Sequence, residues 1–305
     1  AYTDAGGNTS TTYGGGISFS MSTTTDAGVS VTASSAISND NDSVGSSSAA
    51  TGVTALSFGF SNGSITIGGD VGVADGKGKV GELAHYNDNQ TGITNATGLG
   101  DDEGDGISAS TSIGNMTLGV AYVYDGGGVG DVDGSATTSQ SVSLSMPIGS
   151  GSLTVASASD DVGGTNMNEV GVAYTGMEGL TVKAAMGENN EAADQIDLSV
   201  MGITYAMGPV TVGYQSNESD RGTGTDEDFT AYGISYAVSD DVSISYGASS
   251  LDYSSALEDQ ESSAVSISFT AGGVAMSASH QTTDNVAGTA ASDNTGYEIN
   301  FSFAF

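Results

Sequence analysis

The chain has 305 residues, of which 37% are hydrophobic and 47 are glycine, while only two are proline and none is tryptophan. So few apolar residues argue against a large soluble core, whereas patterned Val, Ile, Thr and Tyr favour strands over disorder. With 37 acidic against 4 basic residues the formal net charge is -33. This balance argues against nucleic acid as a partner, because phosphate contacts are made chiefly by Lys and Arg.

Cysteine is absent, which excludes disulfides, thiolate metal sites and a cysteine nucleophile. No run of about 18 apolar residues occurs, so no transmembrane helix is expected. The first residues show no basic, apolar signal sequence, and we expect that any export signal has been removed.

Large hydrophobes that alternate with polar residues predict strands along the whole chain, about seventeen in all. Four short strands are expected before residue 68, and the alternation is regular from residue 106 onward. In residues 196–205 the hydrophobes change from even to odd positions at Val200 and Met201, which predicts a bulge. The last strand alternates five large hydrophobes with smaller or polar residues: Tyr297, Ile299, Phe301, Phe303 and Phe305.

The connections between these strands are of two kinds. Short turns are expected at residues 61–63, 113–115, 147–151, 175–179, 239–241 and 271–273. Longer acidic loops are expected at residues 38–52, 125–138, 159–167, 187–194, 216–227, 252–261 and 283–295. Such a pattern is typical of an up-and-down meander whose two ends face different environments.

The positions between the hydrophobes are mostly Ser, Thr and Gly. In a soluble sandwich the hydrophobes of about seventeen strands would have to fit between two sheets. In a closed barrel they face lipid, the interior is polar, and every backbone group is paired. The second arrangement accommodates all the residues, so the sequence predicts an all-β, transmembrane, antiparallel up-and-down β-barrel that forms a single domain over residues 1–305.

Residues 16–75 resemble the N-terminal part of general diffusion porins from α-proteobacteria, most nearly the Rhodobacter type. The resemblance is carried by GISFSMSTTTDAGVSVTASS and FGFSNGSITIGGDVGVAD, together with a terminal phenylalanine in FSFAF. It implies an outer-membrane location, contacts with lipid and lipopolysaccharide, and a homotrimer. It also implies that residues 69–105 fold into the lumen as a constriction loop. Such porins usually have sixteen strands, and a first strand is apparently missing upstream, so we expect 16–18 strands.

By this resemblance, the residues that shape the narrowest part of the pore lie in the inward loop: Asp75, Lys77, Lys79, Glu82, His85 and Tyr86. The alternative interpretation is that GKGK is a flexible exposed turn. The arginine cluster typical of the family is not found, because Arg221 is the single arginine and falls in a rim loop. We therefore expect a broadly negative lumen that prefers cations.

Parity along the strands assigns four charged residues to the lumen wall: Glu169, Lys183, Asp197 and Glu298. A charge on the lipid face costs roughly 2–4 kcal/mol near the bilayer midplane, which favours the lumen for Lys183. The alternative for each of these residues is a wetted wall position with no special role.

Two acidic stretches are rich in the oxygen ligands that calcium prefers. The DDEGDG stretch supplies the candidate ligands Asp101, Asp102, Glu103 and Asp105, and NDND occupies residues 39–42. Neither has EF-hand spacing, and a solvated acidic loop is the alternative. Bound calcium could bridge acidic loops or lipopolysaccharide phosphates, although no cofactor is required.

The sequence thus predicts a porin for passive diffusion of small hydrophilic solutes and cations. An enzyme is not expected, because His85 and His280 are far apart and no nucleophile elbow or phosphate loop is found. One alternative is a substrate-specific outer-membrane channel with eighteen strands. A less favoured alternative is a secreted acidic calcium-binding β-adhesin, which would show a fixed glycine-aspartate repeat.

Overall fold

The computed structural model describes residues 2–5, 8–11, 13–41, 48–69, 71–73, 105–125, 138–160, 166–191 and 194–303. In these ranges the chain forms 19 strands and one short 3-10 turn, η1 (Val286–Gly288). The strands are β1 (Tyr2–Ala5), β2 (Asn8–Thr11), β3 (Tyr13–Thr24), β4 (Ser30–Asn41), β5 (Ser48–Phe60), β6 (Gly63–Gly68), β7 (Asp105–Ile113), β8 (Met116–Asp125), β9 (Ser139–Ile148), β10 (Gly151–Asp160), β11 (Asn166–Met177), β12 (Leu180–Glu191), β13 (Asp194–Met207), β14 (Val210–Arg221), β15 (Glu227–Ala237), β16 (Val242–Tyr253), β17 (Gln260–Ala271), β18 (Val274–Asp284) and β19 (Asn294–Phe303).

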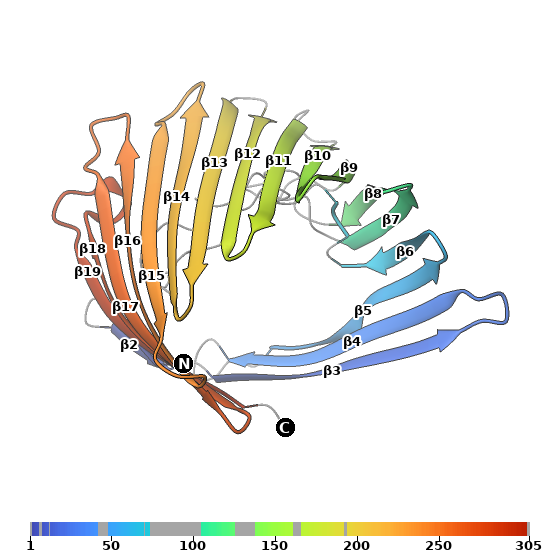
Figure 1. The fold of residues 1–305 in the computed structure, drawn as a ribbon, viewed down its shortest axis with the longest axis horizontal. Helices are drawn as coiled ribbons and strands as arrows, with labels where there is room; N and C mark the ends of the chain where they lie inside the picture. The colour runs from blue at the N-terminus through green and yellow to red at the C-terminus, as the bar shows by residue number, and fades with distance from the viewer. Residues whose placement is uncertain are drawn as a thin grey trace.

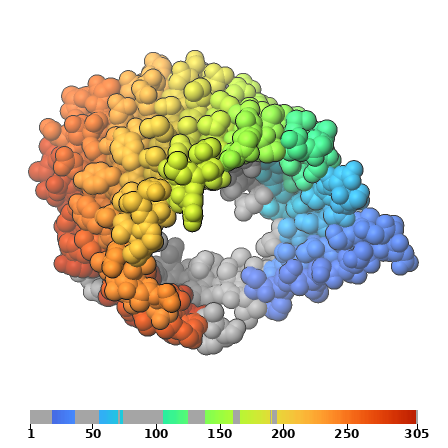
Figure 2. All heavy atoms as spheres, in the orientation of Figure 1, coloured from blue at the N-terminus to red at the C-terminus, as the bar shows by residue number. Residues whose placement is uncertain are grey.

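All 19 strands belong to one antiparallel sheet. From β3 to β19 each strand pairs with the next along the chain, as in the β17–β18 and β18–β19 pairs, and β19 then pairs with β1 and β1 with β2. The ribbon curves around a central space, and the space-filling view shows a hollow on the inner side of the curved wall of described strands (Figures 1 and 2). The expected all-β antiparallel up-and-down architecture is confirmed.

Only one residue separates β2 from β3, so the sheet has eighteen strands if these two are counted as one interrupted strand. This number lies within the predicted range of 16–18. The upstream first strand stays a prediction. Within the ranges that the structure describes, no helix is long and apolar enough to span a membrane.

Short turns join the strands at one end of the sheet. Gly114 and Gly208 begin two-residue turns with φ of 65° and 58°, the left-handed conformation that tight hairpins need. At the other end, the predicted loops at 187–194 and 216–227 are mostly strand, because β12 runs to Glu191 and β14 to Arg221. The alternation continues there with polar instead of apolar side chains, so hydrophobicity alone placed the strand ends too early.

The two faces of the sheet differ in chemistry. On β15, Tyr232, Ile234 and Tyr236 are 56%, 45% and 44% exposed and share one face of the strand, while the buried Gly233 and half-buried Ser235 belong to the other face. The inward face carries hydroxyl pairs such as Ser243–Ser268 and Ser245–Ser266, each 2.6 Å apart. Large exposed hydrophobes therefore form an outer belt around a hydroxyl-lined interior, which is the arrangement that a membrane barrel requires.

The predicted bulge at Val200 and Met201 is wrong. β13 pairs with both β12 and β14 without a register shift at this point. Met201 and Ile203 therefore face outward, while Ile196 and Val200, which are 8% and 7% exposed, face inward. The hydrophobic side chains change from the outward to the inward face because the outside of the sheet changes from lipid to water along β13. The alternation of the backbone itself is unbroken.

The buried apolar residues of the described strands lie on the inward face toward the long-loop end. Phe229 and Leu251, which are 3% and 8% exposed, are cross-strand partners on β15 and β16. Together with Ala231 they form one cluster, against which Tyr253 packs, and Ala185, Leu198 and Val200 form another. Between the outer belt and the long-loop end, the sheet thus has apolar side chains on its inward face and polar side chains on its outward face. Within the belt the two faces are the other way round.

Candidate pore and its lining

The six residues predicted to shape the constriction lie outside the described residues: Asp75, Lys77, Lys79, Glu82, His85 and Tyr86. The same holds for the calcium candidates Asp101, Asp102 and Glu103, while Asp105 is the exposed first residue of β7 and pairs in register with Asp125. No group of three or more acidic or histidine side chains in the described part of the chain is arranged to hold a metal ion. Both roles stay predictions.

Residues 71–73 show how the chain continues after β6. Val71 is only 3% exposed, and a Cβ atom built on Gly106 of β7 would lie 2.7 Å from its Cγ2 atom. The Val73 amide donates a hydrogen bond of 3.2 Å to Ser141 Oγ on β9. Gly106 and Ser141 belong to the inward rows of their strands, so residues 71–73 lie on the inner wall and cross β7, β8 and β9.

Three of the four predicted wall residues have inward parity. Glu169 alternates with Val170 and Val172 on β11 and is 5% exposed, opposite Gly187 of β12. Lys183 is partly buried on β12, opposite Gly202. Glu298 on β19 accepts a hydrogen bond of 2.7 Å from Asn300 Nδ2. Whether any of them controls permeation stays a prediction.

The fourth, Asp197, lies on the opposite face from the one predicted. It is exposed and shares parity with Met201 and Ile203, because β13 has no bulge. Its cross-strand partners are Glu188 of β12 and Asp220 of β14, which are also outward. The assignment to the lumen assumed that the hydrophobes Ile196 and Leu198 face lipid, whereas they face inward.

These three carboxylates belong to an outward acidic band above the apolar belt, which the sequence interpretation missed. The band consists of Glu188, Asp197, Glu218, Asp220, Asp228, Asp252, Glu261 and Asp284. Strict alternation carried past Tyr232 and Tyr246 would have revealed it. By parity, the inward rows of the described strands carry the carboxylates Glu169, Glu227 and Glu298, with Asp40, Asp160, Glu191 and Asp194 towards the strand ends, and the bases Lys183 and Arg221.

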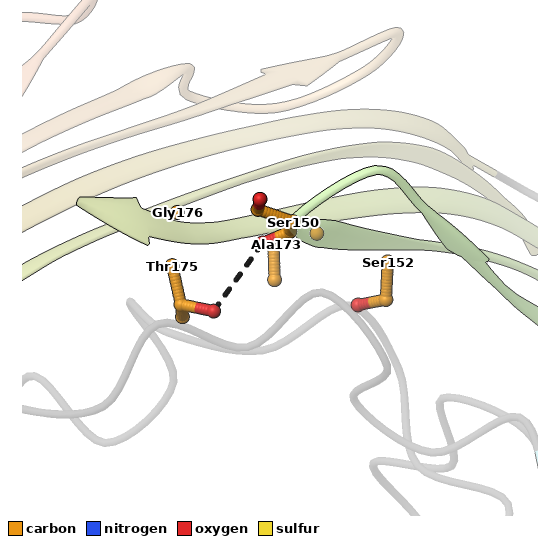
Figure 3. Close-up of a pocket in the computed structure, with 6 residues that line it drawn as sticks. Ser150, Ser152, Ala173, Thr175 and Gly176 are labelled. Atoms are coloured by element: carbon orange, nitrogen blue, oxygen red, sulfur yellow. Dashed lines mark hydrogen bonds between the residues drawn. The ribbon is translucent and has the colours of Figure 1, made fainter.

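A shallow hollow lies at the short-turn end, between β10, β11 and the turn that joins β9 to β10 (Figure 3). It is lined by Ser150, Gly151, Ser152, Ala173, Thr175 and Gly176. The Thr175 hydroxyl and amide both donate to the Ser150 carbonyl oxygen, at 3.3 and 3.1 Å, and so fix the β11 backbone at its bulge. No charged side chain lines the hollow, so it offers a wetted wall without a specific polar anchor.

A sequence model of the family described as Gram-negative porin matches residues 1–256. The chain belongs to the Gram-negative porin family. A search of curated protein sequences finds no match. This porin is accordingly an outer-membrane channel protein and not an enzyme, and the lipid-facing belt and polar interior of its sheet are those of its family.

Solved structures share the fold of this porin. Pseudomonas aeruginosa OprD matches with a TM-score of 0.69 and 9% identity, over 100% of this chain and 93% of its own. OccK3 (OpdO) of the same organism matches with a TM-score of 0.68 and 12% identity, over 99% and 92%. A mutant of the Rh. blastica porin matches with a TM-score of 0.58 and 20% identity, over 100% and 96%. At these identities the matches show the fold alone.

Proposed function

We propose that this porin is a cation-preferring channel for passive diffusion of small hydrophilic solutes. The observation that carries the proposal is the sign of its charges: 37 acidic against 4 basic residues around a hydroxyl-lined interior. Carboxylates near a pore mouth raise the local cation concentration, since low-dielectric walls focus their field. A passive channel needs no catalytic group, only a width and a potential.

The acidic band, together with the rim, is the main source of this preference in our proposal. By parity the described inward rows hold seven carboxylates and both described bases, whereas the outward band holds eight carboxylates and no base. The rim loops add further carboxylates, among them Asp226, Glu258, Asp259 and Asp293. Their summed field attracts cations to the mouth at low salt.

A planar-bilayer recording with a KCl gradient tests the proposal directly. The purified porin should open ohmic channels, and its reversal potential should have the sign of potassium selectivity. A reversal potential of the opposite sign would contradict the cation preference, and the absence of any conductance from well-folded protein would contradict the channel.

We also propose that residues 69–105 narrow the lumen. Support comes from Val71 and Val73, which lie on the inner wall and not over the rim.

A trimer is proposed from the family resemblance, and calcium binding by residues 101–105 is proposed from their oxygen-rich composition. Light scattering of the detergent-solubilised porin tests the trimer, and titration calorimetry with calcium chloride tests the ion.

A substrate-specific channel is the second candidate. It is favoured by the inward cluster of Phe229, Ala231 and Leu251 near the long-loop end, which gives the upper wall an apolar patch. Liposome swelling with sugars and amino acids of equal size separates the two. Uptake rates that follow size alone support general diffusion, whereas a solute that saturates and blocks the current supports specificity.

A further inference from the structure

Residues 71–73 lie on the inner wall through two apolar side chains, with Val71 over Gly106 and Val73 over Gly119. Val71 packs over Gly106, which pairs in register with Val123 of β8, a residue that is only 2% exposed. The first contact is therefore dry and apolar.

Gly119 of β8 lies at the second contact. A Cβ atom built on Gly119 would lie 3.4 Å from both Cβ and Cγ1 of Val73 and 2.9 Å from Ser143 Oγ. A separation of 3.4 Å is ordinary van der Waals contact, so Val73 lies directly over the Gly119 position. Gly106 is restricted further, because a Cβ atom there would also lie 2.8 Å from Val123 Cα.

A hydrogen bond completes the contact. Ser141 on β9 is 7% exposed, and its hydroxyl accepts from the Val73 amide at 3.2 Å. The Val73 amide is half-buried, and a buried donor that loses its acceptor costs about 1–3 kcal/mol. Gly106, Gly119 and the Ser141 hydroxyl thus fix where residues 71–73 lie on the inner wall.

We propose that residues 71–73 are an anchor that positions the segment that follows them, with Gly106, Gly119 and Ser141 as its seat on the wall. This inference rests on the proposed function, in which residues 69–105 narrow the lumen. In this proposal the contacts of Val71 and Val73 hold the start of that segment against β7, β8 and β9, and so affect the cross-section left for solutes. Val73 and Gly119 are positioning residues, because they need not touch the solute.

A designed disulfide tests the anchor without requiring any channel activity. The chain has no cysteine, and the 3.4 Å separation of the two Cβ positions is near the 3.5–4.5 Å that disulfides span. The V73C/G119C double variant should cross-link completely in the folded porin. The control variant V73C/S245C (the decoy) places the second thiol on β16 instead. Ser245 is an inward residue there, and its hydroxyl is hydrogen-bonded to that of Ser266 on β17. A decoy that cross-links equally well, or a designed pair that does not cross-link, would overturn the anchor.

Conductance then tests the consequence. The oxidised V73C/G119C porin should conduct like wild type, since the bond holds residues already in contact. V73D should change the single-channel conductance by about 1.5-fold or more and add current noise, because a carboxylate loses the apolar contact over Gly119 and is costly to desolvate against the wall. S243A removes a wall hydroxyl bond elsewhere and should leave conductance unchanged. Wild-type conductance in V73D would overturn the positioning role, whereas a silent wild type would contradict the proposed function and leave the cross-link to decide on the anchor.

Discussion

Glu218 of β14 and Asp228 of β15 are cross-strand partners on the outward face, and Asp252 of β16 pairs in register with Asp228 on its other side. Like charges directly opposite each other in a sheet are destabilising. We therefore expect D228N to raise the free energy of unfolding by roughly 0.5 kcal/mol, because it relieves two repulsions at once. Urea unfolding of the porin in detergent, at low ionic strength, measures it.

The matched control for D228N is D240N, which removes a carboxylate from the exposed turn before β16. It should shift stability less, since no cross-strand carboxylate faces residue 240. Added salt should reduce the gain of D228N, because exposed charges are screened. A gain that persists in 1 M salt would mean that the repulsion is not its cause.

Two neighbouring residues of β15 can test which face of the sheet contacts lipid. Ile234 lies in the middle of the outer belt between Tyr232 and Tyr236, and Ser235 faces inward. I234K should cost roughly 2–4 kcal/mol of stability in lipid vesicles, because it places a charge on the lipid face. S235K adds the same side chain to the hydroxyl-lined wall and should cost little. Equal losses in the two variants would contradict the assignment of the faces.

Lys183 is an inward base on the described part of β12. K183E should increase the preference for cations, and K183Q should have about half of that effect, because it changes the wall charge by one unit instead of two. Reversal potentials in 1 M KCl gradients measure both, and E188K is the control on the outward face of the same strand, where salt at this concentration screens the charge of the acidic band. A larger shift in E188K than in K183E would place the selective field outside the lumen.

The pair Lys77 and Lys79 tests the constriction loop. If these lysines reach the narrowest part of the pore, K77E/K79E should increase cation preference more than K183E does, because a field is strongest where the passage is narrowest. Unchanged selectivity would place both on an outer surface.

Strand alternation was enough to predict the barrel, because a membrane sheet exposes one face to hydrocarbon along its whole circumference. The final strand and β15 were recognised in this way from Tyr297 to Phe303 and from Tyr232 to Val238. The same rule failed above the belt. There the outside is aqueous, so Phe229 and Ile196 turn inward with unbroken alternation, and Asp197 was assigned to the wrong face.

The 71–73 contact could not be found from the sequence. Gly106, Gly119 and Ser141 are ordinary residues of a glycine- and serine-rich chain, and only their placement on three adjacent strands makes them a seat for Val71 and Val73. Val73 and Ser141 are 68 positions apart in the sequence, and a single sequence does not show which residues so far apart come into contact.

The dependence of the cation preference on salt concentration separates the effect of charges outside the lumen from the effect of charges that line it. Charges outside the lumen act over the Debye length, which falls from about 10 Å at 0.1 M to about 3 Å at 1 M salt, whereas charges that line a narrow passage are screened less. We expect the cation preference to weaken between these concentrations, because most described carboxylates lie on the outward band and the rim. Neutralising Asp228, Asp252 and Glu261 together should lower the preference at 0.1 M and not at 1 M. The inward control E169Q should lower it at both concentrations, and a preference independent of salt in the wild type would assign selectivity to the constriction instead.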